Sequence, residues 1–572
     1  MTTFRLPKID IHSWLDRSRW LDGGVLLAVL LACGTALSLN VADPDLWGHV
    51  QYGRDAWQHG LPLTTTYSYI AQGYPWVNHE ILAELALAAV NDSLGGVGLM
   101  ALKCLLGLFV VALVMRGATR QGVGLIATCT IALLVAVSLG NHWSLRPQLV
   151  SYVSFTLLLA LLAWCFEGWE GKWRFCKEPL AYSLDRLKFL WLVPVLMMLW
   201  TNSHGGFLAG YCVFVAYLGL RSIEAIARLG RQADGLVLRF VLMAAAAGAS
   251  TFINPYAHHF HLWLWDDLKV PRPEIVEWRS PDFSDPSTIP FILLCACFVA
   301  CIALSKRSRD LTHCVILVLI LWQAMTHHRH IAFFAIACGF WLPVHLESVM
   351  KRFRLVSDHA DFSGALSPKL RLAFAGGLIL ALVICSVQLV GRLGQLKVER
   401  DMYPVAALDY VAQRNLTGKM VVTFNWAQYA LAAVGPREDR KGVLVHIDGR
   451  CRTSYSQRML DEHFDFILGD LPASERYRDP ASGPFDPARV LRSGNPDLVL
   501  ISREQQPSAN VMNRQRDRWV VLYQDELAQL WGRTAKYGDP RSPHYIPLQH
   551  RCISNESQHG FAPWPALPTA QL

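Results

Sequence analysis

Long apolar stretches dominate this chain of 572 residues and restrict it to folds that surround them with lipid or with each other. A helix needs about 20 mostly apolar residues to cross a bilayer, and fewer where protein covers it. Only 17% of the residues are charged, whereas soluble domains carry about 25%. We predict about eleven transmembrane helices, over residues 22–40, 98–115, 124–140, 148–166, 189–201, 207–222, 236–253, 289–304, 311–325, 331–346 and 371–390.

The basic residues are distributed unequally between alternate loops. If the N-terminal segment 1–21 is cytoplasmic, most Lys and Arg between the spans fall on that same side. The opposite loops hold only Arg54, Arg146, Lys269, Arg272, Arg279 and Arg329. By the positive-inside rule, the N-terminus is then cytoplasmic and everything after the last span is extracytoplasmic. The net charge of +8 falls in short loops rather than in one basic patch, which argues against a nucleic-acid partner.

The same alternation divides the chain into domains. The transmembrane domain is predicted over 22–395, and its first extracytoplasmic loop over 41–97. Segment 79–92 must not cross the membrane, because crossing would invert every later loop, so we expect an amphipathic interfacial helix there. Short β-rich runs alternate with helical stretches over 396–545, which predicts a soluble α/β domain. Residues 546–572 are rich in Pro, His and Ser, and we expect a flexible tail.

Two aspartates stand at the mouth of the first span. The sequence Val-Ala-Asp-Pro-Asp-Leu-Trp-Gly-His places Asp43, Asp45, Trp47 and His49 directly after an apolar stretch. Carboxylates at a membrane surface are costly and usually functional. An acid here could act as general base on an acceptor group, and the pair could hold a divalent cation, Mg or Mn, through oxygen ligands.

Other polar groups fall in the loops that share this predicted face. Arginines at the outer ends of spans, Arg146 and Arg329, could grip a phosphate bidentately. The remaining candidates are Arg54, Trp76, His79, Glu80, Asn202, His204 and Asn254. Convergence of such groups with an aromatic-lined, membrane-facing groove is what transfer of a sugar from a polyprenyl-phosphate carrier requires.

Each of these features also has an ordinary structural interpretation. Asp43-Pro44-Asp45 could simply end a helix, and the loop aromatics could form an interfacial belt. Segment 204–206 could be a tight turn, and 327–330 an end cap with spacing that suits no metal site well. The sequence contains no Ser-His-Asp elbow, Walker loop, dinucleotide fingerprint or HExxH motif.

The pattern resembles the GT-C superfamily of polytopic glycosyltransferases, such as the protein O-mannosyltransferases and the lipid A aminoarabinose transferases. Those enzymes carry an acidic motif in the first extracytoplasmic loop and follow it with interfacial helices, as 43–47 and 79–92 do here. The chain also resembles a large group of bacterial membrane proteins through motifs at 43–47, 76–80, 146–148, 202–207, 254–256, 403–404, 425–426 and 447–450. It departs from that group at Gly48, where a second aromatic is usual, and at 328–330, where Arg-Arg-Asn is usual.

The resemblance implies a bacterial inner-membrane glycosyltransferase of mainly α fold that uses a polyprenyl-phosphate sugar donor. The acceptor would be a lipid, a glycan or a protein. Asp43 and Asp45 would supply a base or metal ligand, assisted by Glu80 and His79. The substrate-binding residues would be His49, Arg54, Trp76, Arg146, Asn202, His204, Asn254 and Arg329. The alternatives are a non-catalytic envelope scaffold of the same fold and a lipid-linked glycan transporter, which should show two related halves.

Overall fold

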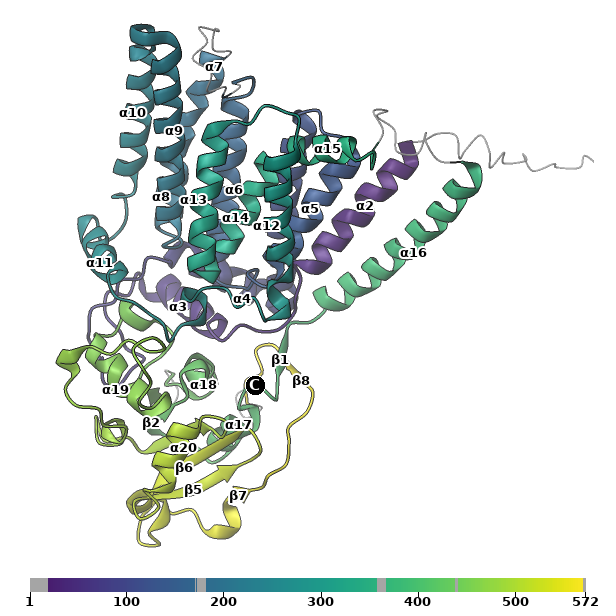
Figure 1. Ribbon diagram of the computed structural model, residues 1–572. Coiled ribbons are helices and arrows are strands. Elements are labelled where there is room, and N and C mark those ends of the chain that lie inside the picture. Colours follow the sequence, from purple (N-terminus) through teal and green to yellow (C-terminus); the bar gives the residue numbers. More distant parts are fainter. Residues whose placement is uncertain (1–18, 170, 172–181, 357–366, 438–440, 569–572) are drawn as a thin grey trace, which may run out of the picture.

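A computed structural model describes residues 19–169, 171, 182–356, 367–437 and 441–568. It consists of a body of roughly aligned helices and, below one end of that body in Figure 1, an α/β domain built from the C-terminal part of the chain. The segment 1–21, predicted to be cytoplasmic, lies almost wholly outside the described residues. The helical body comprises α2 (Arg19–Ala36), α3 (Leu46–His59), α4 (Ile81–Arg120), α5 (Leu125–Gly140), α6 (Gln148–Cys165), α7 (Leu184–Leu187), α8 (Val193–Thr201), α9 (Phe207–Leu229), α10 (Asp234–Ser250), α11 (His258–Leu268), α12 (Ile289–Leu304), α13 (Leu311–Thr326), α14 (Ile331–Trp341), α15 (Pro343–Arg352) and α16 (Pro368–Leu393).

Several of these helices are long and apolar enough to cross a membrane. Among the described residues, five helices pass by length and composition, or six if the bent pair His328–Trp341 and Pro343–Arg352 forms one span. One of the five, Phe207–Ser250, contains both α9 and α10, which lie side by side in Figure 1. Shorter apolar helices occupy Trp20–Ala36, Leu125–Gly140 and Leu311–Thr326. The mainly helical class is confirmed, and the count of about eleven spans stays a prediction.

The segment expected to be an interfacial helix is the first part of α4. Gly95 interrupts this 40-residue helix with φ 61° and ψ −153°, a conformation that glycine adopts without steric cost. The residues before Gly95 pack against α3, and a side chain at Gly53 would collide with the backbone of Glu84. This close approach joins the first loop to the start of α4 at the end of the helical body nearest the α/β domain (Figure 1).

Loops that were predicted to share the extracytoplasmic side gather at that same end. The first loop reaches the α/β domain through bridges of Val41 with Lys397 and of Ser68 with Val445. Helix α11 reaches it through an ion pair of its residue Asp267 with Arg452. Because helix ends far apart in sequence meet one domain here, polar residues from many loops can line a common space.

The α/β domain is a six-stranded mixed sheet with the order β3-β2-β4-β6-β5-β7. Strands β3, β2 and β4 run parallel, and β6 is antiparallel to both β4 and β5. Strands and helices alternate within 396–545, as the short β-rich runs and helical stretches of that segment predict. The elements are α17 (Val405–Gln413), β2 (Gly418–Val422), α18 (Ala427–Val434), β3 (Val443–Val445), α19 (Gln457–Ile467), β4 (Leu498–Ser502), α20 (Gln506–Asn513), β5 (Trp519–Gln524), β6 (Ala528–Arg533) and β7 (Cys552–Ile553).

The segment expected to be a flexible tail, 546–572, contributes structure over its described part. It supplies β7, and then β8 (Phe561–Pro563), which pairs antiparallel with β1 (Lys397–Glu399). The ring of Trp564 lies 4.7 Å from that of Trp47, whose indole nitrogen donates to the carbonyl of Pro565. A Pro-rich composition suggested a loose end, but aromatic packing and strand pairing fix this segment against the first loop.

Candidate functional site

A polar cavity of about 270 Å³ lies between the gathered loops and the α/β domain. Its walls come from α3, the segment before α4, the turn before α6, the break between α8 and α9, and the segment after α11. The α/β domain contributes Gln428 and residues 449–453. The cavity therefore requires both parts of the molecule.

The two aspartates of the first loop occupy different surroundings. The carboxylate of Asp43 accepts the backbone N–H of Asp45 and, at 2.6 Å, the Nε–H of Arg146. Its side chain is 9% exposed and does not line the cavity. The side chain of Asp45 is 28% exposed, lies 3.3 Å from Arg146 and lines the cavity. Of the two, only Asp45 can meet a substrate.

Burial raises the pKa of Asp45, although the nearby guanidinium of Arg146 opposes that shift. Arg146 itself binds three carboxylates, since its Nη1 donates to Glu277 at 3.1 Å. An arginine held by three acids has little capacity left for a phosphate. These ion pairs favour a positioning role for Arg146 toward Asp45 and Glu277, and its expected contact with a phosphate stays a prediction.

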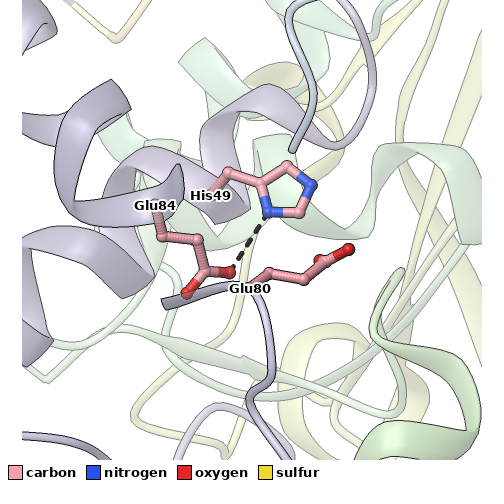
Figure 2. A group of neighbouring side chains, drawn as sticks. All are labelled: His49, Glu80 and Glu84. Atoms are coloured by element: carbon pink, nitrogen blue, oxygen red, sulfur yellow. Dashed lines mark hydrogen bonds and ion pairs between the residues drawn. The ribbon is translucent and has the colours of Figure 1, made fainter. Parts of the chain in front are cut away.

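His49, Glu80 and Glu84 form the group shown in Figure 2. Each offers one ligand atom, and these atoms all lie within 4.8 Å of one another. His49 Nδ1 lies 3.2 Å from Glu84 Oε1, and the other oxygen of Glu84 accepts from Asn78 at 2.6 Å. Burial lowers the pKa of His49, but the hydrogen bond to Glu84 and the charge on Glu80 outweigh it and raise the pKa overall.

Glu80 also faces two further histidines. Its Oε1 lies 3.8 Å from Nε2 of His204 and 3.9 Å from Nε2 of His79. Burial alone would raise the pKa of Glu80, but the neighbouring His79 and His49 lower it overall. The Nδ1 atom of His204 accepts the N–H of Gly206, so its proton resides on Nε2 and points toward Glu80. Glu80 is thus a carboxylate set among histidine rings.

A basic wall faces the same cavity. The guanidinium groups of Arg272 and Arg329 each lie 4.7 Å from the ring of Trp278. Arg272 is paired with Asp267. Among the described residues, Arg329 has no carboxylate within ion-pair distance, and burial lowers its pKa. Arg329 is therefore a cation in the cavity wall that an anionic ligand could pair with.

The α/β domain closes the cavity through close backbone approaches. The side-chain oxygen of Gln428 accepts the N–H of Gly48 at 3.2 Å. A Cβ atom on Gly48 would collide with Gln428, and one on Gly449 would collide with Gln428 and Asp45. These contacts explain why position 48 holds glycine rather than an aromatic residue.

Three of the predicted binding residues lie away from the cavity. Arg54 pairs with Asp92 on α4, at the surface. The amides of Asn202 and Asn254 bind backbone carbonyls at helix ends, so both shape turns. Trp76 does line the cavity, as a face against which the guanidinium of Arg450 packs at 4.6 Å.

Sequence reasoning missed several lining residues. Glu84 lies one helical turn from Glu80 on α4, a spacing that places both on one face and could have revealed it. Arg272 lies in the loop after α11, and Glu277 and Trp278 lie in the short 3-10 helix Val276–Trp278. None of the three belongs to a sequence motif, so no local signal marks them. Gln428 comes from another domain, and only the folded chain brings it here.

Solved structures share this architecture. The chain matches an oligosaccharyltransferase of Archaeoglobus fulgidus in the apo form with 11% identity and TM-score 0.53, over 86% of this chain and 70% of that one. It matches AglB of the same organism, in complex with an inhibitory peptide and a dolichol-phosphate, with 9% identity and TM-score 0.52, over 88% and 72%. It matches ArnT from Cupriavidus metallidurans bound to undecaprenyl phosphate with 13% identity and TM-score 0.51, over 93% and 100%.

No protein-family model matches the chain, and no curated protein matches it in sequence. The matched oligosaccharyltransferase AglB and ArnT are both members of the GT-C superfamily, and the expected resemblance is confirmed at the level of the fold. At 9–13% identity, the likeness shows the fold alone.

Proposed function

We propose that this chain is a membrane glycosyltransferase that moves a sugar from a polyprenyl-phosphate donor to an extracytoplasmic lipid, glycan or protein. Two relatives of the same fold carry dolichol-phosphate and undecaprenyl phosphate in their structures, which supports a polyprenyl-phosphate donor here. The observation that carries the proposal is the cavity itself. It holds a carboxylate, Asp45, and a cation without a carboxylate partner among the described residues, Arg329, in one polar space.

In this reaction the arginines of the cavity would bind the donor phosphate, and Asp45 would accept a proton from the acceptor. The donor phosphate would lie against Arg329 and Arg272, where guanidinium groups stabilise a leaving phosphate. The acceptor oxygen or nitrogen would attack the anomeric carbon as the bond from that carbon to the phosphate oxygen breaks. Its proton would pass to Asp45, the general base. Burial raises the pKa of this carboxyl, which makes it a better proton acceptor once ionised.

A divalent cation could assist through His49, Glu80 and Glu84. The donor set of one imidazole and two carboxylates suits Mn²⁺ or Zn²⁺ better than Mg²⁺, which prefers oxygen ligands alone. This set replaces the Asp43–Asp45 pair that we expected to bind the ion, because Asp43 is bound to Arg146. Such a cation would displace the proton between His49 and Glu84, and it would supply charge stabilisation near Asp45. Isothermal titration of the purified chain with Mn²⁺ and Zn²⁺ at pH 7.5, compared with Glu84→Gln, tests this directly.

The decisive experiment separates donor binding from transfer. Purified chain would be titrated with undecaprenyl phosphate, and transfer would be followed by loss of sugar from a panel of undecaprenyl-phosphate sugars in the presence of membrane extract. Arg329→Gln should weaken binding, whereas Asp45→Asn should abolish transfer and keep binding. Arg54→Gln, which lies outside the cavity, is the matched control. A wild-type chain that binds no polyprenyl phosphate would favour the scaffold alternative instead.

The orientation in the bacterial inner membrane belongs to the same proposal. The excess of Lys and Arg in the opposite loops supports an extracytoplasmic position for the cavity. A reporter fused after residue 400 should be active only outside the cytoplasm. Activity inside would overturn the orientation while leaving the fold intact.

A further inference from the structure

A second cavity, of about 480 Å³, opens at the opposite end of the helical body, among α4, α6, α9, α13 and α15. In Figure 1 this is the upper end, where α7 and α15 lie. None of the residues assigned to sugar transfer lines it. It lies at the end whose loops hold most of the Lys and Arg residues between the spans, which the positive-inside rule assigns to the cytoplasm.

Three arginines on the rim of this cavity have no acidic partner. They are Arg116 and Arg120 on α4 and Arg307 in the loop before α13. Among the described residues, none of them lies within ion-pair distance of a carboxylate. The two acids that line the cavity are already engaged, since Asp310 pairs with Arg221 at 2.6 Å and Glu167 pairs with Arg186 at 2.5 Å. Counting only the described residues, the cavity therefore carries positive charge that no carboxylate compensates.

The floor of the cavity is formed around Arg221, which is held by ion pairs and aromatic rings. Arg221 is 1% exposed, and its Nη1 and Nη2 bind Glu224 and Asp310. Its guanidinium lies 5.0 Å from the ring of Tyr217 and 5.6 Å from that of Trp169. Asp310 also caps α13 by accepting the N–H of Thr312. The Arg221 guanidinium in this floor is already paired with two carboxylates, so the ligand-binding capacity lies with the three rim arginines.

The deeper walls are apolar and reach the outer surface of the helices. Leu113, Ala160 and Trp164 line the cavity from α4 and α6. The ring of Trp164 lies 4.7 Å from that of Phe189, which is 47% exposed on the outside of the helical body. A ligand here would have a charged group beside arginines and an apolar part against side chains that border lipid.

We propose that this cavity binds the phosphate of an anionic glycerophospholipid, with its acyl chains along the Trp164 wall. Bidentate pairing of arginine with phosphate is geometrically favourable, and a phosphate would offset the repulsion among three like charges. A soluble phosphate shares the same polar chemistry, but it would leave the apolar wall unused. The site is independent of the proposed transferase activity.

The test uses the full-length chain in an uncharged detergent and native mass spectrometry. Dioleoyl phosphatidylglycerol should bind, and dioleoyl phosphatidylcholine should bind much more weakly. The triple variant Arg116→Gln, Arg120→Gln, Arg307→Gln should weaken phosphatidylglycerol binding roughly a hundredfold, at about fivefold for each arginine. Its charge-matched control is Arg231→Gln, Arg239→Gln, Arg354→Gln, which changes exposed arginines that do not line the cavity and should bind as the wild type does. Equal loss in both triple variants, or equal binding of the two lipids, would overturn the proposal.

A second measurement distinguishes lipid from soluble phosphate. Glycerol phosphate, which has no acyl chains, should fail to displace the lipid at equal concentration. Trp164→Ala should weaken lipid binding and leave any binding of glycerol phosphate unchanged. Displacement by glycerol phosphate at equal concentration would show that the cavity takes a soluble phosphate and would overturn the lipid assignment. Thermal melting and gel filtration of every variant verify that each one is folded.

Discussion

The two cavities of this molecule differ in whether their arginines are paired with carboxylates. In the cavity beside the α/β domain, Arg146 binds three carboxylates, and Arg272 and Arg452 share Asp267. In the cavity at the far end, the described rim arginines meet no carboxylate at all, and the only lining arginine with acidic partners is buried in the floor. Both spaces are lined by several arginines and lie at helix ends, so we compare how the charge of each arginine is compensated.

This difference in pairing indicates which arginines position neighbouring carboxylates and which are available to bind an anionic ligand. A paired arginine fixes the carboxylates around it, and removing the arginine leaves buried charges behind. An unpaired arginine contributes little to folding and remains available for an anion. Within the first cavity, Arg329 is of the second kind, which is why we assign it, rather than Arg146, to the donor phosphate.

The largest expected effect concerns Asp45. Asp45→Asn removes the proposed base and should lower transfer by about a hundredfold or more, while melting temperature and membrane level stay near those of the wild type. Transfer of sugar from undecaprenyl-phosphate donors, measured on purified variants, checks this. Full transfer activity in Asp45→Asn would contradict the proposal that Asp45 of the first loop is the general base.

The stability of the Arg146→Gln variant tests the difference between paired arginines in the first cavity and unpaired arginines in the second. Three carboxylates would lose their common partner, so the free energy of unfolding should fall by about 3 kcal/mol, the lower end for breaking a buried pair, because Arg146 keeps some exposure. Arg116→Gln should not destabilise the chain, since it relieves repulsion without leaving an acid unpaired. Thermal melting of the two variants in one detergent gives the comparison. Similar losses in both would contradict the contrast between the cavities.

A pH-dependent effect is expected at His49. Because its folded-state pKa lies above the ordinary 6.5, the charged ring stabilises the fold fully below pH 6.5. That contribution is lost as the pH rises through the folded-state pKa. The melting-temperature difference between wild type and His49→Gln should therefore be larger at pH 6 than at pH 9. His59→Gln, at the exposed end of α3, is the control. A difference that does not change with pH would contradict the pairing of His49 with Glu84.

The smallest expected effect concerns the contact between Gln428 and Gly48, by which the α/β domain closes the first cavity. Gln428→Ala should cost about 1 kcal/mol through the lost hydrogen bond to Gly48. Gly48→Ala should cost about 1–3 kcal/mol, because its Cβ would collide with the Gln428 side chain. The double variant should be more stable than Gly48→Ala alone, since the collision partner is gone. Additive losses by thermal melting would show that Gln428 does not fill this space.

Much of the fold could be predicted from the sequence. Apolar length located the helices, and alternation of short β-rich runs located the α/β domain, because both signals are local. The Asp43–Asp45 segment was identified for the same reason, since acids directly after an apolar stretch stand out.

What could not be predicted depends on contacts between distant segments. The sequence could not separate Asp43 from Asp45, because the separation comes from Arg146, about a hundred residues further on. It placed Arg54, Asn202 and Asn254 in the site on residue type alone, although their partners lie elsewhere. Segment 546–572 was expected to be a flexible tail from its content of Pro, His and Ser. The strand pairing of its described part could not be predicted, because the partner strand β1 lies more than 150 residues earlier.

The pairing of β8 with β1 has a consequence for biosynthesis. Segment 561–565 follows every described helix in the chain, yet it covers Trp47, two residues from Asp45. During translation the aspartate loop emerges 518 residues before Pro565, whose carbonyl accepts the indole N–H of Trp47. A chain terminated before segment 561–565 would keep its described helices and lack the wall behind its first loop. Formation of this wall therefore comes after synthesis of all the described helices.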